Sequence, residues 1–274
     1  MSDETVWRSA AEVVRRTMTA RGRASSGLYS IEGIRLHERA LRAGKRVQTA
    51  VVGEAFYATQ EPRIQALLYD LLLAGCELVV APDALLAELA EGRDLGAIIG
   101  VLPIPPSPDL ASFLDLHNRE APLFLVAADI KDPGNAGALV RTALASGATA
   151  LIAGGICDPY HPKAVRTSMG SLFKLPIIAV EDTVAALEQL AEVGIECVGL
   201  AVDGDVLLPK AEFGDTGLAV VVGSEAFGLD DALREAVDII VAIPMREGVD
   251  SYSVNTAAAI ALYEIGRRQA AKGG

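Results

Sequence analysis

The second half of the sequence contains six apolar runs in which hydrophobic residues follow one another without polar alternation. They are PLFLVAADI, ALIAGG, LPIIAV, ECVGLAV, GLAVVVG and DIIVAIP, and segments of helical periodicity separate most of them. Strands that are buried on both faces, as in a parallel sheet covered by helices, have this continuous pattern. The runs therefore predict an α/β domain with a parallel sheet. Because ligands bind such sheets at the carboxyl ends of the strands, the loops that follow the runs should hold the site.

The first hundred residues alternate differently, and a proline-rich segment separates them from the second half. Strand-like runs at 27–33, 47–53, 76–81 and 95–102 alternate with segments of helical periodicity. The segment PIPPSPD at 103–109 then favours an extended, stiff connection. We expect a smaller N-terminal αβ domain over 1–102, a linker and connecting segment over 103–120, and the parallel-sheet domain over 121–274.

Charge is distributed unevenly along the chain. The formal net charge of −12 disfavours a nucleic-acid partner, because Lys and Arg supply the affinity for phosphate. Residues 7–46 nevertheless hold ten Lys and Arg against three Glu. This asymmetry suggests a polyanion partner, although a solvated helix face can have the same composition. The basic residues expected to contact that partner include Arg15, Arg16, Arg21 and Arg23.

Composition and spacing argue against several other classes of protein. No apolar run reaches about 18 residues, and the N-terminus lacks the order of a signal peptide, so we expect a cytoplasmic protein without a membrane segment. The three cysteines lie far apart without a CxxC pair, which suggests neither a disulfide framework nor a zinc site. We expect buried thiols and no bound metal.

Two loops that follow predicted strands contain basic residues near a helix start. In DIKDPGNAGALVRTALASGA, Asn135 can cap a helix over 135–147, and Arg141 projects away from its apolar face beside the bare backbone of Gly137. In DPYHPKAVRTSMGSLFKLPI, Lys163 and Arg166 lie on the first turns of a helix, where both would suit phosphates. A solvated surface position explains Arg141 equally well from this loop alone.

Two further loops combine glycine with polar residues. In VVVGSEAFGL, Gly223 ends a buried run, Glu225 follows, and Gly228 opens a helix over 228–236; the loop lacks the GxGxxG fingerprint of dinucleotide sites. These glycines can admit a nucleoside, or serve a tight turn. In IPMREGVDSYSVNTAAAIALYEI, the start of a helix over 253–265 holds Ser251, Ser253 and Asn255, which is more than capping needs.

Taken together, these loops resemble the SpoU (TrmH) branch of the SPOUT family of S-adenosylmethionine-dependent RNA 2′-O-ribose methyltransferases. The resemblance covers residues 121–268, where DPGNAGALVRTALASGA, VVGSEAFGL and IPMREGVDSYSVNTAAAIALYE occur in the family's order and spacing. The stretch YSIEGIRLHERAL resembles the ribosomal-protein-like substrate-binding domain of many members. The resemblance implies a C-terminal sheet threaded into a trefoil knot, a homodimer, S-adenosylmethionine as cofactor, and RNA, with ribosomal RNA favoured, as substrate.

By position, the resemblance also implies roles for particular residues. Those matching the family's cofactor contacts, or lying beside them, are Gly223, Ile243, Met245 and Tyr252. Those matching its catalytic motifs are Arg141, Asn135, Glu225 and Ser253. The family usually has Ser-Leu-Asn-Val where this chain has Ser-Tyr-Ser-Val, so Ser253 replaces an asparagine of the active site. Asn255 is expected to point elsewhere, because it lies two positions further along a helix.

Three alternatives remain open at the level of sequence. The substrate can be transfer RNA. The chain can be an RNA-binding protein that retains the fold without catalysis, because a serine hydroxyl on a shorter stem replaces the family's amide. A nicotinamide- or nucleotide-using α/β enzyme is disfavoured by the missing phosphate-binding fingerprint.

Overall fold

The computed structural model describes residues 4–91, 97–117, 121–214 and 216–272, which fall into two compact units. The first unit comprises Met1–Pro105 and Asp158–Phe173, and the second comprises Pro106–Cys157 and Lys174–Gly274. The chain therefore passes between the units at three points rather than at the proline-rich segment alone.

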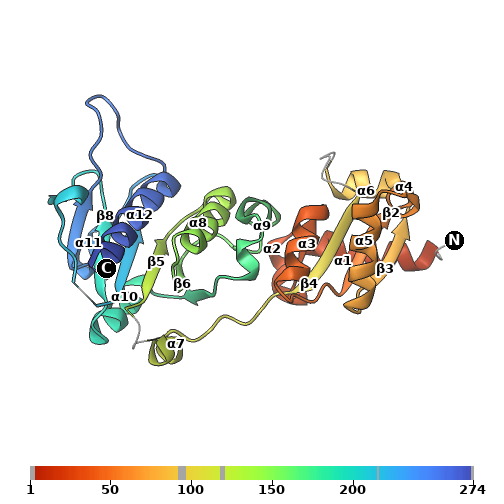
Figure 1. Ribbon diagram of the computed structural model, residues 1–274, viewed down its shortest axis with the longest axis horizontal. Helices are drawn as coiled ribbons and strands as arrows, with labels where there is room; N and C mark the ends of the chain where they lie inside the picture. Colours follow the sequence, from red (N-terminus) through yellow and green to blue (C-terminus); the bar gives the residue numbers. More distant parts are fainter. Residues whose placement is uncertain (1–3, 92–96, 118–120, 215, 273–274) are drawn as a thin grey trace. The chain divides into compact units, whose positions relative to one another are not determined.

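The first unit is built on a four-stranded mixed sheet (Figure 1). Its order is β1 (Leu28–Glu32), β4 (Ile98–Pro103), β2 (Thr49–Gly53) and β3 (Glu77–Ala81); β2 and β3 are parallel, and the other pairs are antiparallel. Its helices before residue 92 are α1 (Glu4–Thr17), α2 (Ala20–Ser26), α3 (Ile34–Arg42), α4 (Glu54–Ala58), α5 (Pro62–Leu73) and α6 (Asp83–Leu89). Helices α1 and α6 share one hydrophobic core with β2 and β4. The four strands expected from the sequence are confirmed.

Residues 158–173 belong to the first unit although the sequence pattern groups them with the second half. They form α9 (Pro162–Ser168) and the short 3-10 helix η1 (Ser171–Phe173). Arg23 Nε donates to Asp158 Oδ2 at 2.6 Å, and Arg166 donates to Glu32 Oε1 at 3.2 Å. Further contacts join the Tyr29 and Tyr160 rings, 5.0 Å apart, and the Arg39 guanidinium and the Met169 carbonyl. This stretch is thus held to α2, β1 and α3 by ion pairs, an aromatic contact and a hydrogen bond.

The second unit contains a seven-stranded sheet in which every paired strand is parallel. Its order is β7 (Ile177–Val180), β6 (Ala150–Gly154), β5 (Leu123–Ala128), β10 (Leu218–Val222), β8 (Glu196–Leu200), β11 (Ile239–Ala242) and β9 (Val206–Leu207). All six expected strands are present, and every residue of β5, β6 and β10 is buried, which confirms the parallel sheet. The two-residue strand β9 was not expected, because so short a run has no pattern. The trefoil knot stays a prediction.

Helices cover both faces of this sheet (Figure 1). Helices α7 (Leu110–His117), α10 (Thr183–Glu192) and α11 (Asp231–Ala236) share a core with one face. Helices α8 (Pro133–Ala145) and α12 (Val254–Lys272) pack against each other and contact β5, β6 and β10. The η2 turn (Leu208–Lys210) contacts α12. The apolar stripe of α12 includes Ala258, Ala261, Leu262 and Ile265, all of which are buried.

Two helices begin at residues other than those expected. Helix α8 starts at Pro133, because Asp132 caps it by accepting a hydrogen bond from the Asn135 N–H at 2.9 Å. Asn135 is therefore not the cap. Helix α11 starts at Asp231 rather than at Gly228, because Gly228 adopts a left-handed conformation with φ of 66° and Asp230 caps the helix.

Candidate active site

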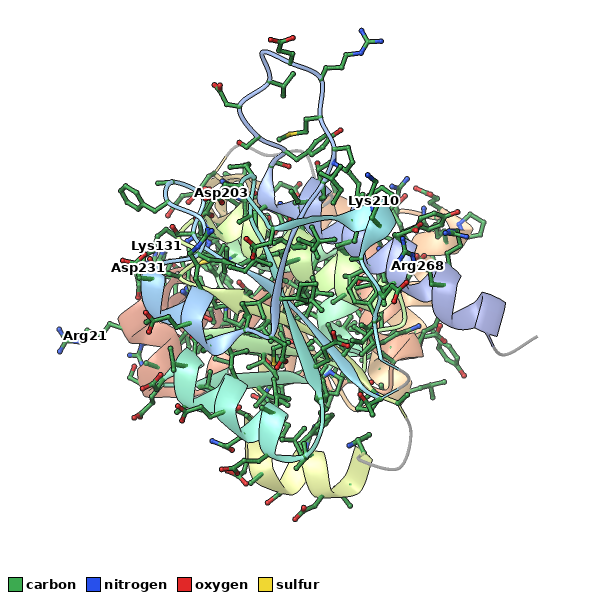
Figure 2. All side chains as sticks on the ribbon, turned by 90° about the vertical axis from the view of Figure 1, so that its left-hand side faces the viewer. Arg21, Lys131, Asp203, Lys210, Asp231 and Arg268 are labelled. Atoms are coloured by element: carbon green, nitrogen blue, oxygen red, sulfur yellow. The ribbon has the colours of Figure 1, made fainter. Side chains whose placement is uncertain are left out.

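A cavity of about 290 Å³ lies at the carboxyl ends of β8, β10 and β11. In a parallel sheet these ends share one edge, so the loops that follow the three strands surround the same space. Its lining comes from residues 200–203, residues 222–229, Arg234, and the segment from Val241 to Ala257. The loop between β11 and α12 extends beyond the ends of the strands (Figures 1 and 2). The volume is near the lower end of the range for small-molecule pockets, about 300–1,000 Å³.

All four residues expected to contact a cofactor line this cavity. Ile243, Met245 and Tyr252 come from the loop after β11, and Gly223 comes from the end of β10. Tyr252 is 40% exposed, so it lines the cavity while part of it stays open to solvent. These residues are far from continuous in sequence, and the strand ends bring them together.

The turn after β10 is sufficient to explain a glycine at position 223. A Cβ atom there would lie 2.0 Å from the carbonyl oxygen of Gly228. Ser224 and Gly228 exchange two backbone hydrogen bonds of 3.0 and 2.9 Å across the same turn. Of the two explanations that the sequence allowed, the structure therefore supports the tight turn.

Glu225 is held by hydrogen bonds from the loop after β5. Its carboxylate accepts from the backbone N–H groups of Lys131 at 3.2 Å and Asp132 at 3.1 Å, and from Asn135 Nδ2 at 2.9 Å. Partial burial opposes ionisation, but these bonds outweigh it and hold the pKa of Glu225 below its ordinary value. Glu225 is thus an anion that joins two loops at the edge of the cavity.

Asn255 extends this network, which the sequence-based expectation missed. Its Nδ2 donates to Asn135 Oδ1 at 2.8 Å, so Asn255, Asn135 and Glu225 form one chain of hydrogen bonds. The expectation that Asn255 points elsewhere is wrong, because α12 packs on α8 and directs position 255 toward it. The excess of polar residues at this helix start was the signal in the sequence.

Ser253 has a different environment from Asn255. Its Oγ lies 2.9 Å from Thr256 Oγ1 and accepts from the Thr256 N–H at 3.4 Å, which is a capping arrangement at the start of α12. Ser253 is exposed and has no hydrogen bond to Asn135 or Glu225.

Arg141 is exposed on α8, as expected from its place off the apolar face. Among the residues that the structure describes, it has no hydrogen-bond or ion-pair partner, so its guanidinium is available to a ligand. Gly137, in contrast, is buried, and the expectation that a ligand approaches its backbone is wrong. The face that contains Gly137 is covered within the fold.

The charged groups that line the cavity are mostly acidic. Asp203, Glu225 and Asp250 are carboxylates, and the single basic lining residue, Arg234, forms an ion pair with Asp203 at 3.1 Å. This pairing holds the pKa of Asp203 below its ordinary value. The lining therefore favours a ligand with positive charge over one with several phosphates.

The residues expected to contact RNA differ in their availability. Arg23 is 1% exposed, and besides Asp158 it donates to the Thr17 carbonyl at 2.8 Å. Arg23 therefore holds the first unit together, and its assignment to RNA is wrong. Arg15 and Arg16 pair with Glu88 and Glu12 at 2.9 and 3.8 Å on the surface. Arg21 points away from the ribbon without a partner among the described residues (Figure 2).

Lys163 and Arg166 lie on α9 and hence in the first unit. Lys163 is exposed, whereas Arg166 is partly buried by its ion pair with the buried Glu32. The two residues therefore share a unit with Arg15, Arg16 and Arg21, but only Lys163 is as open to solvent as they are.

Within the described ranges of the chain, no group of three or more His, Cys, Asp or Glu side chains is arranged to hold a metal ion. None of the helices in the same ranges is long and apolar enough to cross a membrane. Cys76 and Cys197 are buried thiols, and Cys157 is half-buried.

The sequence and the fold of this chain are similar to those of known RNA methyltransferases. Residues 122–263 match the SpoU rRNA Methylase family. A 23S rRNA (guanosine-2′-O-)-methyltransferase, RlmB, from Burkholderia sp. is 32% identical over 84% of this chain and 94% of its own. The SpoU methyltransferase AviRb from Streptomyces viridochromogenes, solved in complex with AdoMet, is 27% identical with a TM-score of 0.83, over 95% of this chain and 98% of that one. An RNA 2′-O ribose methyltransferase structure is 30% identical with a TM-score of 0.76, over 96% of both chains.

Proposed function

The chain belongs to the SpoU rRNA methylase family, and on that premise we propose that it transfers a methyl group from S-adenosylmethionine to a ribose 2′-hydroxyl of ribosomal RNA. The observation that carries the proposal is the cavity at the strand ends, which gathers Ile243, Met245 and Tyr252 beside the anionic Glu225. Relatives named for ribosomal RNA 2′-O-methylation that match most of this chain support the substrate class.

The cavity suits S-adenosylmethionine in both its apolar lining and its charge. Val222, Ile243 and Met245 offer apolar surface for a nucleoside, and Tyr252 offers an aromatic face. Asp250 and Glu225 add negative charge, which attracts the positive sulfonium and ammonium groups of this cofactor. When bound, the cofactor supplies an electrophilic methyl group on positively charged sulfur.

Methyl transfer requires that the ribose oxygen be aligned and that its proton be removed. Bound S-adenosylmethionine would supply the methyl group that becomes bonded to this oxygen, its sulfur would keep the electrons of the broken bond, and water would accept the hydroxyl proton. Arg141 stays protonated, so its role is to hold the neighbouring phosphate and to stabilise the charge that develops on the oxygen. Asn135 and Glu225 fix the loop from which the helix of Arg141 starts.

The first unit would hold the RNA. Its exposed cations include Arg21, Arg35 and Arg46 from the basic segment and Lys163 from α9. We further propose that the protein works in the cytoplasm as a homodimer, with residues 1–102 as substrate-binding domain and 103–120 as linker. The family resemblance supports these points, and light scattering of the purified chain tests the dimer.

A second candidate is an RNA-binding protein that retains the cofactor cavity without catalysis. The observation that favours it is Ser253, which caps α12 instead of contacting Asn135 or Glu225. Transfer RNA remains the alternative substrate. A nicotinamide enzyme is disfavoured by the acidic lining, because a dinucleotide would place its pyrophosphate there.

Calorimetry with the full-length protein tests the cofactor site. We expect S-adenosylmethionine to bind and NAD not to bind, and we expect Tyr252→Ala to weaken the cofactor affinity about tenfold, or about 1.4 kcal/mol. The matched control is Tyr57→Ala, because Tyr57 is similarly exposed at 47% but lies on α4 of the first unit. Equal affinity in the wild type and Tyr252→Ala, or binding of NAD alone, would contradict the assignment of this cavity.

A variant at Gly223 is unsuited to this test. Any side chain there collides with the backbone of Gly228, so a loss of binding would report a distorted turn. A truncated chain that starts near residue 110 is equally unsuited, because Asp158, Tyr160 and Arg166 would lose Arg23, Tyr29 and Glu32. Point variants of the full chain avoid both problems.

A further inference from the structure

The side chains of Asn255, Asn135 and Glu225 form a continuous polar chain across three segments of the second unit. Asn255 lies in the first turn of α12, Asn135 in the first turn of α8, and Glu225 in the loop after β10. The two side-chain bonds measure 2.8 and 2.9 Å. The carboxylate at the end of the chain also holds the backbone of residues 131 and 132.

The bond from Asn255 decides which way the amide of Asn135 faces. An amide has one accepting oxygen and one donating nitrogen, so donation by Asn255 turns the Asn135 oxygen toward α12 and its nitrogen toward Glu225. If Asn135 rotated, its oxygen would face the carboxylate and repel it. Asn255 thus acts on Glu225 only through Asn135.

The side-chain oxygen of Asn255, Oδ1, is a second unusual feature. It is buried, and no donor among the described residues lies within hydrogen-bonding distance of it. A buried acceptor without a partner is unfavourable, so an apolar or smaller residue would suit a purely packing role better. The side chain is therefore better explained by the donor that it offers to Asn135.

We infer that Asn255 is a positioning residue for methyl transfer, which orients Asn135 and Glu225 and thereby sets the placement of α8. The inference rests on the proposed function of the same site. Arg141 lies six residues after Asn135, about 9 Å along the helix axis. A helix start that is fixed on the loop of Glu225 holds Arg141 at a constant position relative to the cavity. Asn255 supplies the amide donor at the start of α12, because the Ser253 hydroxyl is hydrogen-bonded to Thr256 and caps the helix.

Replacement by aspartate separates this role from packing. Asn255→Asp keeps the shape of the side chain but removes the donor, and it adds a carboxylate to a network that already ends in one. We expect kcat to fall at least 30-fold in Asn255→Asp and at least tenfold in Asn255→Ala. The dissociation constant of S-adenosylmethionine and the KM for RNA should stay within threefold. The matched control is Thr256→Ala on the same helical turn, which should keep kcat within threefold.

A double-mutant cycle tests whether Asn255 acts through Asn135. We expect Asn135→Ala combined with Asn255→Ala to lose no more activity than Asn135→Ala alone, because the second change removes a group with nothing left to orient. A double variant whose loss of kcat equals the product of the two single losses would overturn the inference. So would an Asn255→Asp variant with wild-type kcat.

Hydrogen–deuterium exchange tests the network without any activity. The backbone N–H groups of residues 131 and 132 are protected by Glu225, so their exchange should be at least threefold faster in Asn255→Asp than in the wild type or Thr256→Ala. Unchanged exchange in both Asn255 variants overturns the inference. If the wild type transfers no methyl group to any RNA, the proposed function fails, and the exchange rates still decide whether Asn255 controls the loop.

Discussion

In the second unit, polar side chains that follow different strands converge on one cavity, whereas in the first unit most arginines of the basic segment bind carboxylates or carbonyls of their own unit. Asp203, Glu225 and Asp250, which follow β8, β10 and β11, lie around the same space. Arg15, Arg23 and Arg42, in contrast, form ion pairs with Glu88, Asp158 and Glu38. The first unit is the basic part of the sequence, but much of its charge is neutralised internally.

The difference follows from what determines the position of each side chain. A parallel sheet places the carboxyl ends of its strands along one edge, so a residue just after a strand has a known neighbourhood. A charge on a helix has no such constraint, and a carboxylate far away in sequence can neutralise it. Motifs at strand ends are therefore better guides to a site than counts of charge.

The largest effect is expected at Arg141, an exposed cation of the second unit that has no partner among the described residues. Arg141→Ala should lower kcat by about 100- to 1,000-fold, which is the usual cost of removing one group that stabilises developing charge. Affinity for S-adenosylmethionine, measured by calorimetry, should stay within threefold. Arg141→Lys should not restore the rate, because a point charge lacks the two-pronged guanidinium.

A matched control for Arg141 is Arg267→Ala, another exposed arginine of the second unit, which pairs with Glu264 on α12. It should retain kcat within threefold. A near-normal rate in Arg141→Lys would remove Arg141 from the catalytic group.

Acid should weaken the first unit before it affects the cavity. His37 is fully buried, and burial lowers its pKa to about 4, whereas an exposed histidine titrates near 6.5. As pH falls from 6.5 to 4, the unfolded chain binds a proton that the folded chain does not. The free energy of unfolding should therefore drop by about 3 kcal/mol over that window. Glu225 titrates in a lower pH range, because its pKa is lowered in the folded chain. Its contribution to stability is present above about pH 4.5 and is lost only below that pH.

Fluorescence of Trp7, the one tryptophan of the chain, reports this transition because Trp7 packs against the core of the first unit. Urea titrations followed by Trp7 fluorescence should show this drop in the free energy of unfolding in the wild type. They should not show it in His37→Gln. His117→Gln, on α7 of the second unit, is the control and should retain it. A pH-independent wild type between 6.5 and 4 would contradict the burial of a neutral His37.

Arg23 and Arg21 offer a direct contrast within the first unit. Arg23→Ala should lower the free energy of unfolding, measured by Trp7 fluorescence, by about 2 kcal/mol, because Asp158 and the Thr17 carbonyl lose a charged donor. Arg21→Ala should change it by less than about 0.5 kcal/mol but should reduce the slope of log affinity for RNA against log salt by about 0.7–0.9. An unchanged slope in Arg21→Ala would indicate that this segment is a solvated face.

The smallest effect is expected at Ser253. Its hydroxyl faces Thr256 and has no bond to the network of Asn255, Asn135 and Glu225, so Ser253→Asn should keep both the cap and the rate within about threefold. A tenfold gain in kcat would show that the family's asparagine acts from position 253 and that this chain is impaired without it.

The sequence was sufficient for the strands and for the composition of the cavity, and insufficient for contacts between distant helices. Uninterrupted apolar runs predicted all six longer strands of the second unit, because burial on both faces excludes polar residues. Asn255 was missed because its partner is on α8, 120 residues away, and helical periodicity alone does not reveal which helices pack together. Arg23 was misassigned for the same reason, because Asp158 lies 135 residues away.

The most direct test of the account is the chemical identity of the methylated nucleoside. Full-length wild type and Arg141→Ala would be incubated with S-adenosylmethionine and ribosomal RNA that lacks modification, and the RNA would be digested to nucleosides for mass spectrometry. We expect a 2′-O-methylated nucleoside with the wild type and at most 1% of that amount with Arg141→Ala at equal times. A wild type that binds the cofactor and the RNA but yields no 2′-O-methyl nucleoside, or one that methylates a base instead, would contradict it.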